Sequence, residues 1–534
     1  MYGAPDTLFF LTTLLPHRKQ SAIMLSEKNM RSSRYLIALV LSSAALIHAE
    51  PRLPSVLSDH AVLQRDRPVR IWGWATPQEK ITVKFHDQTR TADTNVLGEW
   101  QVFLLPEHAG GPFTLSVTSD QATTPIERKD ILLGDVWIAS GQSNMEMPLK
   151  GFGSAPIKDS EKEIAAANHP RIRFLLQKRS TSSVPLADSA DTWTECTPAT
   201  AANFSAAAYF FGREISEKEN VPVGLIDTTW GGTPAHSWIS LEGIAAAGLT
   251  SVANDAATIA RDQGIADRIR ADYARQAEAA KAAGQPVATH PPIPNDHAGS
   301  WAPGTLYNAM IAPYVRYTIK GAIWYQGETD TSPARAQYYS RVFSTLIKDW
   351  RAQWAQGDFP FFYVQISSYT ADNDGWGRVR DAQRRTLSLV NTGQAVTLDV
   401  GLEKNIHPPD KQTVGARLAA NALATVYGKK MEYSSPEFLQ ATTEPGAMRV
   451  WFSHGEGLTT KGQPVGGFEV AGDDHKFVSA TGTIEKVGAA ETIVLNAPGV
   501  PMPKYARYAW TGVVTSYVYN AAGFPLGTFT SESM

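Results

Sequence analysis

The chain has 534 residues, 43% of them hydrophobic, and a net charge of −3 at neutral pH. This length exceeds what one ordinary core needs, so we expect about two to four domains, and the charge gives no reason to expect nucleic acid as a partner. The single cysteine, Cys196, excludes an intramolecular disulfide and any metal site built from several cysteines.

Residues 1–49 have the layout of an upstream segment followed by a signal peptide. The basic residues of 31–34 precede an apolar run over 35–47, and Ala49 ends a small-residue cleavage pattern. The apolar run is shorter than the roughly 20 residues that a membrane span requires. We therefore expect cleavage after Ala49 and a secreted or periplasmic protein without a stable membrane anchor.

Residues 50–130 are predicted to form an all-β domain. Several segments alternate apolar and polar residues with period two, and turns rich in glycine and proline separate them: Val69–Trp74, Ile81–Phe85, Trp100–Leu104 and Phe113–Val117. This spacing is typical of a β-sandwich of the jelly-roll or immunoglobulin-like kind. The segment carries no cluster of ionisable side chains, so we assign it no chemistry.

Residues 131–429 alternate predicted strands with predicted helices, which favours a doubly wound, mostly parallel sheet. The strands are Asp135–Ala139, Ile172–Leu176, Val223–Asp227, Ala322–Tyr325, Phe361–Ile366 and Ala395–Val400. An insertion over about 250–303 interrupts the pattern. Its Ala-rich, charged part over 251–284 is predicted to be a largely exposed helix, and we expect the insertion to cover the site. Residues 430–534 return to a β-rich pattern, so the sequence indicates an α/β domain with flanking β-sandwich material.

Candidate catalytic and oxyanion-binding residues follow the predicted strands of the α/β domain. Ser143 follows the first, Gly231 and Gly232 follow Val223–Asp227, Gln326 follows Ala322–Tyr325, and His407 follows the last. Parallel strands place such ends on one edge of the sheet. A serine, a histidine and N–H donors are the groups that acyl transfer needs. The backbone N–H groups of Ser143 and of Gly231 or Gly232, with an amide from Gln326 or Asn144, are candidate oxyanion donors; such a donor typically contributes about 3–4 kcal/mol.

Four blocks in this order, GQSNM, WGGTP, WYQGETD and IHPPDK, resemble the sialate O-acetylesterase-like branch of the SGNH hydrolases, which are carbohydrate O-acetylesterases. The resemblance extends over residues 53 to 530. It implies that Ser143 is the nucleophile, that His407 is the general base and acid, and that the glycine of the second block and the amide of the third form the oxyanion hole. Gln142, Asn144 and Glu328 are expected near the substrate, with Glu328 a hydrogen-bonded structural carboxylate.

One feature departs from this resemblance. SGNH enzymes generally carry Asp-x-x-His, whereas Lys404 stands three residues before His407 here. Glu403 and Asp399 are the leading candidates for the acid that orients the imidazole. Glu328, Asp410 and a Ser–His dyad oriented by a backbone carbonyl are the alternatives.

The combined interpretation is an exported serine esterase that removes O-acetyl groups from an oligo- or polysaccharide. The abundance of tryptophan favours plant-wall hemicellulose such as xyloglucan or xylan, with Trp238 or Trp376 stacking on a sugar ring. The alternatives are a sialate 9-O-acetylesterase, a non-catalytic carbohydrate-binding protein on an esterase fold, and a lipase or peptidase. No metal or organic cofactor is expected, because the spacing of His236, His290 and His297 fits no ligand pattern.

Overall fold

The structure is a computed structural model that describes residues 50–122, 124–153, 155–289, 291, 298–371 and 373–533. The chain divides into Met1–Ala49 and Glu50–Met534, and the fold described below belongs to the second unit. The expected signal peptide and the loop histidines His290 and His297 lie outside the described residues.

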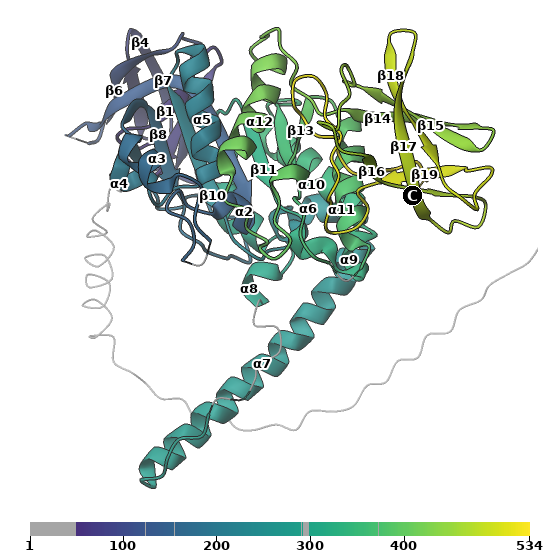
Figure 1. Cartoon of the computed structure of the whole chain (residues 1–534). Coiled ribbons are helices and arrows are strands. Elements are labelled where there is room, and N and C mark those ends of the chain that lie inside the picture. Colours follow the sequence, from purple (N-terminus) through teal and green to yellow (C-terminus); the bar gives the residue numbers. More distant parts are fainter. Residues whose placement is uncertain are drawn as a thin grey trace, which may run out of the picture. The chain divides into compact units, whose positions relative to one another are not determined.

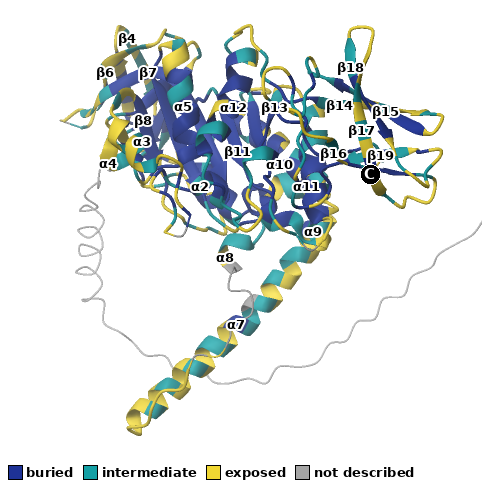
Figure 2. Cartoon of the chain, in the orientation of Figure 1, coloured by how far each residue is buried: buried dark blue, intermediate teal, exposed yellow. Residues whose placement is uncertain are grey.

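A parallel sheet forms the centre of the fold, in the order β13-β12-β11-β7-β10-β8, with β9 antiparallel at the edge beside β8. The middle strands are buried along their length because the predicted apolar runs are covered on both faces (Figure 2). The strands of this sheet are β7 (Ile126–Gly141), β8 (His169–Leu176), β9 (Trp193–Cys196), β10 (Val223–Thr229), β11 (Gly321–Tyr325), β12 (Phe361–Gln365) and β13 (Thr392–Val396).

Helices cover both faces of this sheet, as the βαβ pattern predicts (Figure 1). On one face, Trp137 of β7 packs against Phe211 of α5 (Ala206–Glu219), with ring centroids 5.0 Å apart. On the other, Trp324 of β11 packs against Trp350 of α10 (Tyr339–Trp354), with centroids 5.8 Å apart. Trp324 lies opposite Ser140 in register, three residues beyond Trp137, and alternation along a strand puts the two tryptophans on opposite faces.

The remaining helical elements are mostly short, and some of them are single turns. They are α2 (Ser143–Glu146), α3 (Ser160–Ala166), α4 (Pro198–Ala201), η2 (Ala235–Trp238), α6 (Leu241–Ala246), α7 (Thr250–Ala282), α8 (Ala298–Trp301), η3 (Tyr307–Ile311), η4 (Ala312–Tyr314), η5 (Glu328–Thr331), α9 (Pro333–Ala336), α11 (Gly375–Arg385), η6 (Thr386–Ser388), η7 (Leu398–Val400) and α12 (Lys411–Thr425). The helix predicted within the insertion is α7, which is largely exposed, as expected (Figure 2). Within the described ranges, none of these helices combines the length and the apolar character needed to cross a membrane.

The N-terminal strands share a sheet with the central strands through β7. The first half of β7 pairs antiparallel with β6, and its second half pairs parallel with β10 and β11. The expected domain boundary at 130/131 therefore lies inside a strand. The N-terminal strands are β1 (Val62–Gln64), β2 (Val69–Trp74), β3 (Lys80–Phe85), β4 (Gln88–Asp93), β5 (Glu99–Leu104) and β6 (Gly110–Ser119), of which β2 and β5 form a separate pair.

The C-terminal residues form their own antiparallel sheet of seven strands in the described part of the chain. This is one continuous sheet, so the two packed sheets expected of a sandwich are not seen here. Its core is separate from the main one and is built around Phe468, Tyr508 and Phe529. The strands are β14 (Glu437–Glu444), β15 (Ala447–Ser453), β16 (Val465–Ala471), β17 (Val478–Val487), β18 (Ala490–Asn496), β19 (Tyr505–Tyr508) and β20 (Phe529–Thr530).

A buried arginine on α11 joins this C-terminal region to the α/β core. Arg380 is fully buried, and its guanidinium donates hydrogen bonds to carbonyl groups rather than to a carboxylate. The acceptors are Ile366 and Ser367 after β12, and Ala509, Thr511 and Gly512 after β19. Burial lowers the pKa of Arg380 to about 9. The hydrogen bonds of one side chain therefore connect two separately packed regions.

Candidate active site

The predicted strand ends meet at one edge of the sheet. Thr229 of β10 and Tyr325 of β11 both lie beside Gly141 of β7 in register. Gly141 has φ of +134°, and a Cβ atom there would lie 2.2 Å from the carbonyl oxygen of Tyr325. Only glycine permits that backbone conformation and that approach. The chain can then turn directly into α2, which begins with Ser143.

Ser143 and His407 lie within hydrogen-bond distance of each other. The Oγ atom of Ser143 is 2.8 Å from Nε2 of His407, and both side chains are half-buried. The backbone N–H of His407 donates to Oδ1 of Asn405, and its ring packs edge-on against Phe152 with centroids 5.2 Å apart. The 2.8 Å separation of Oγ and Nε2 allows a proton to pass between the hydroxyl and the imidazole.

The surroundings of His407 favour a neutral imidazole. Its pKa is lowered from the ordinary value, first by burial and then by the positive charge of Lys411. A neutral imidazole can accept the proton of a serine hydroxyl, whereas an imidazolium cannot.

None of the proposed orienting acids reaches His407. Asp399 forms a two-point ion pair with Arg417, with contacts of 2.6 and 2.8 Å, because the predicted strand Ala395–Val400 ends at Val396 and turns through η7. The side chain of Glu403 is exposed. Asp410 caps α12 by accepting from the N–H and the hydroxyl of Thr413. Among the described residues, none hydrogen-bonds Nδ1 of His407, so the expectation that Glu403 or Asp399 orients the imidazole is wrong for this structure.

Two expected oxyanion donors are engaged elsewhere. The amide of Gln326 donates to Asp330 and to the carbonyl of Thr233, and its oxygen accepts from Tyr339, so it faces the interior. The N–H of Gly231 donates to Oε2 of Glu146 at 2.8 Å, although Gly231 lies directly against Ser143. Neither donor is free to meet an oxyanion in this arrangement.

Other N–H groups remain available at the same place. The N–H of Ser143 opens α2, whose first residues have no partner earlier in the helix. Gly232 is exposed and has φ of +73°. Within the described part of the chain, no acceptor is found for either N–H. Gln142, the residue before Ser143, uses its amide oxygen to accept from the N–H groups of Gly327 and Thr329.

A buried polar chain lies behind Ser143. Asn144 donates to Glu328 at 2.6 Å and to the carbonyl of Ile406 at 2.9 Å, and its oxygen accepts from Lys411 at 2.7 Å. Lys411 also donates to the carbonyl of Pro408 at 3.0 Å. Glu328 is buried and hydrogen-bonded, as expected, and burial raises its pKa. Lys411 ends the IHPPDK block, but the block by itself does not indicate that this side chain is buried behind Ser143.

The aromatic residues near Ser143 differ from those expected. Trp238 and Trp376 are buried and donate to Thr233 and to the carbonyl of Ser367, so neither can stack on a sugar. Trp230 and Trp301 are half-buried and flank the glycine pair, and the indole of Trp301 donates to the carbonyl of Gly232 at 2.7 Å.

An ion pair lies beside Trp230. Glu146, one turn after Ser143, binds Arg179, whose Nε is 2.6 Å from Oε1, and the guanidinium of Arg179 lies 5.8 Å from the ring of Trp230. No sequence signal marked Arg179, because it comes from an irregular loop distant in the chain.

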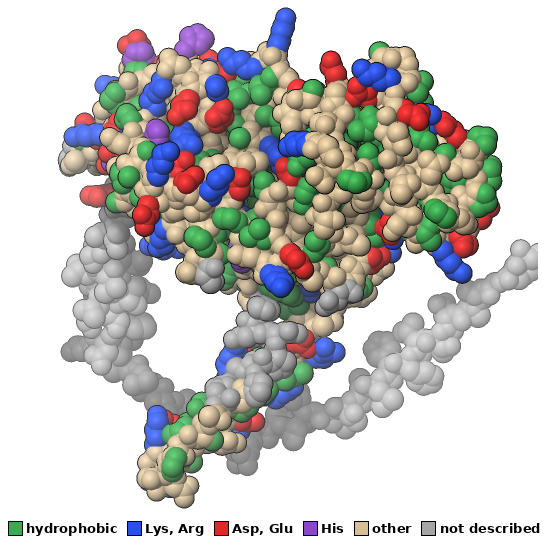
Figure 3. Space-filling model, viewed as in Figure 1, with side chains coloured by type: hydrophobic (Ala, Val, Ile, Leu, Met, Phe, Trp, Pro, Cys, Tyr) green, Lys and Arg blue, Asp and Glu red, His purple; other side chains and the backbone are tan. Residues whose placement is uncertain are grey.

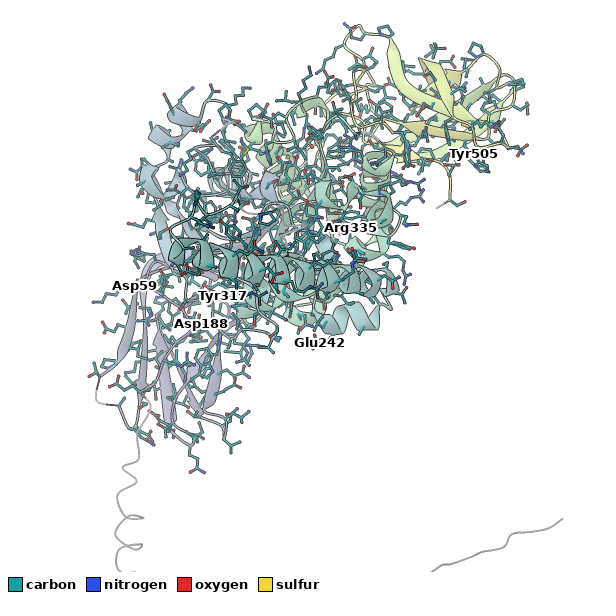
Figure 4. All side chains as sticks on the ribbon, turned by 90° about the horizontal axis from the view of Figure 1, so that it is seen from below. Asp59, Asp188, Glu242, Tyr317, Arg335 and Tyr505 are labelled. Carbon is teal, nitrogen blue, oxygen red and sulfur yellow. The ribbon has the colours of Figure 1, made fainter. Side chains whose placement is uncertain are left out.

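The first turns of the insertion lie beside a cavity that neither Ser143 nor His407 lines. They line this cavity of about 320 Å³ together with His236, Asp330 and Arg335. Arg335 is labelled in Figure 4 and pairs with Asp255 of α7 at 2.7 Å. His236 is buried and bonds the carbonyl of Trp301, which is the packing of a structural histidine. Basic and acidic side chains are interspersed over the described residues on the face in Figure 3, so no single-sign patch dominates it.

Comparison with known proteins identifies relatives over most of the chain. Residues 133–260 and 294–424 match a family model described as carbohydrate esterase, sialic acid-specific acetylesterase. The sialate O-acetylesterase of Rattus norvegicus is 31% identical over 417 residues, covering 71% of this chain and 74% of that protein. The human sialate O-acetylesterase is 28% identical over 506 residues, covering 86% and 87%.

A solved structure extends the likeness to the fold. The crystal structure of a novel carbohydrate acetylesterase from Xanthomonas citri has 32% sequence identity and a TM-score of 0.76, covering 91% of this chain and 100% of that one. The α/β core and its relatives define a carbohydrate O-acetylesterase. The chain belongs to the family of sialic acid-specific acetylesterases among the carbohydrate esterases. The alternatives of a non-catalytic binding protein and of a lipase or peptidase are set aside.

Proposed function

We propose that the enzyme cleaves acetyl esters of sugars with Ser143 as nucleophile and His407 as general base and acid. The single observation that carries this is the 2.8 Å contact between Oγ and Nε2 at the edge where the strand ends meet. Oγ attacks the acetyl carbonyl carbon while His407 takes its proton. The tetrahedral intermediate expels the sugar oxygen, which receives that proton. Water, deprotonated by His407, then attacks the acetyl carbon. The bond from that carbon to Oγ breaks, acetate leaves, and His407 returns the proton to Oγ.

The oxyanion donors follow from the available N–H groups. We assign this role to the N–H groups of Ser143 and Gly232, in place of Gly231 and Gln326, whose donors are engaged. The two assigned groups belong to the loops that follow β7 and β10, which are neighbouring strands. The order of the four sequence blocks along these strand ends also supports the inference that the core is of the SGNH-hydrolase type.

The substrate that we favour is a neutral acetylated glycan such as xyloglucan or xylan. Trp230 and Trp301 offer half-exposed rings beside the glycine pair, and aromatic faces suit sugar rings. The guanidinium of Arg179 already has a carboxylate partner in Glu146, which leaves it less suited to a sugar carboxylate. The second candidate is an O-acetylated sialic acid, which the names of the curated relatives support.

Acetate release from acetylated xyloglucan, xylan and 9-O-acetylated sialic acid tests the proposal. Wild type, Ser143→Ala and His407→Ala are compared on this panel, and each variant is expected to lose at least about 10³-fold in kcat because the nucleophile or its base is gone. Assaying cytoplasmic and extracytoplasmic fractions of producing cells also tests the export that the pattern over 30–49 indicates. Retention of activity in Ser143→Ala contradicts the mechanism, and turnover of the sialic acid ester alone selects the second candidate.

A further inference from the structure

The loop that carries His407 is held from the protein interior rather than by an acid. The carbonyl groups on either side of His407, those of Ile406 and Pro408, accept hydrogen bonds from Asn144 and Lys411 at 2.9 and 3.0 Å. We propose that Asn144 and Lys411 form a clamp that positions the imidazole against Ser143 and takes over the orienting task of a third catalytic residue. This inference rests on the proposed roles of Ser143 and His407.

The clamp is rigid because its two members also bind each other. Nζ of Lys411 lies 2.7 Å from Oδ1 of Asn144, while Nδ2 of that amide is shared between Ile406 and Glu328. Asn144 follows the nucleophile directly, and Lys411 begins α12. The same hydrogen-bonded unit therefore fixes the element that carries Ser143 and the loop that carries His407.

Burial of these groups is costly, which argues that they serve more than packing. Asn144 and Lys411 are fully buried, and a buried ammonium is unfavourable unless charge and hydrogen bonds offset it. Burial lowers the pKa of Lys411 to about 7, against the opposing effect of the Glu328 charge. One oxygen of Glu328 is buried without a partner among the described residues. The hydrogen-bonded group of Asn144, Lys411 and Glu328 is therefore not optimised for stability.

Lys411 also acts on His407 through its charge. Among the described residues, the charged groups joined to the His407 loop are Lys411, which binds the carbonyl of Pro408, and Glu328, which binds Asn144. Asp410 lies at the start of α12, with Lys158 3.8 Å from it. Of these charged groups, only Lys411 shifts the pKa of His407, and it does so downward. Removal of the ammonium is therefore expected to raise the pKa of His407.

Lys411→Met is the variant that tests the clamp, with Lys404→Met as the matched control from the same loop. Lys404 is exposed, so its change removes a charge without touching the clamp. The kcat for acetate release is measured per active site, counted by an organophosphate that reacts with Ser143. We expect Lys411→Met to lose about 100-fold in kcat with little change in KM, because the imidazole is misplaced. Its acidic limb of kcat/KM should move to higher pH, and the control should match wild type.

A purely structural role of Lys411 would lower the number of titrated sites without moving the pH limb. A Lys411→Met enzyme whose kcat and pH limb match those of the control would overturn the proposal. Where Lys411→Met does not fold, Asn144→Ala replaces it: a fall in kcat at constant KM supports the clamp, and an unchanged kcat refutes it. Failure of the mechanism itself gives a different result, namely an active Ser143→Ala enzyme.

Discussion

At the scale of single residues, the chemistry depends on how burial changes the balance between two protonation states. Ser143 is a weak nucleophile unless a neutral base takes its proton. Burial and the Lys411 charge both disfavour the imidazolium form of His407, so they favour the neutral form that can accept a proton. A carboxylate partner would act in the opposite direction, because it stabilises the imidazolium. Among the described residues, none places a carboxylate at Nδ1 of His407, so no such partner opposes the lowering of its pKa.

The wild-type pH profile follows from this shift. The pKa of His407 lies below its usual value of 6.5, so the neutral form persists to lower pH than in a free histidine. We expect the acidic half-point of kcat/KM to fall below pH 6.5, because only the neutral imidazole accepts the serine proton. Initial rates on 4-nitrophenyl acetate from pH 4.5 to 8, in buffers of constant ionic strength, measure it. A half-point above 6.5 would show that the imidazole is stabilised as a cation.

The sequence motifs predicted that Ser143 and His407 would meet, but not the hydrogen-bond partners of the residues around them. Strand ends of a parallel sheet share one edge, so Ser143, Gly231 and His407 could be brought together from the order of the motifs alone. The direction of a side chain within that edge depends on tertiary contacts. Gln326 turns inward because Asp330 and Tyr339 offer it partners, and no local pattern reports that.

At the scale of elements, strong apolar runs predicted correctly where strands occur, but they predicted the ends of those strands less well. The predicted strand Ala395–Val400 continues an apolar pattern past its true end at Val396. Leu398 then enters the C-terminal core, and η7 carries Asp399 toward Arg417 of α12. The pairing could not be foreseen, because it depends on where a distant helix packs.

This turn makes Asp399 a structural residue, and a pair of variants separates that role from catalysis. Asp399→Ala leaves the largely buried Arg417 without its counter-charge and should lower the free energy of unfolding by about 3 kcal/mol. Glu403→Ala is the control from the exposed loop and should change it by less than about 0.5 kcal/mol. Urea unfolding measures both, and kcat per active site should stay near wild type in each. A loss of about 10⁴-fold in Asp399→Ala would instead mark a triad acid.

At the scale of the whole molecule, the flanking β regions relate to the core in different ways. The C-terminal sheet has its own core and meets the α/β domain through contacts such as those of Arg380. The N-terminal strands share the main core and, through β7, the main sheet. The sequence predicted β-rich flanks correctly, but period-two patterns carry no information about which sheet a strand joins.

The Arg380 contacts predict a large effect from one substitution. Arg380→Met should destabilise the protein by roughly 3–5 kcal/mol, because several buried carbonyl groups lose their donor together. Arg378→Met, on the same helix, removes a surface ion pair with Asp374 and should cost less than about 1 kcal/mol. The midpoints of thermal unfolding, followed by tryptophan fluorescence, compare the two. Equal shifts would mean that Arg380 does not join the regions.

The continuity of β7 has a consequence for how this enzyme can be divided or recombined. One uninterrupted backbone spans both the antiparallel partner β6 and the parallel partners β10 and β11. A chimaera that exchanged the first module at residue 130 would sever the ladder five residues before Asp135, whose carboxylate binds Gln64 and Arg65. The N-terminal strands are thus part of the same sheet as the α/β core. Only a chimaera that transfers β7 intact would preserve the pairing of both halves of that strand.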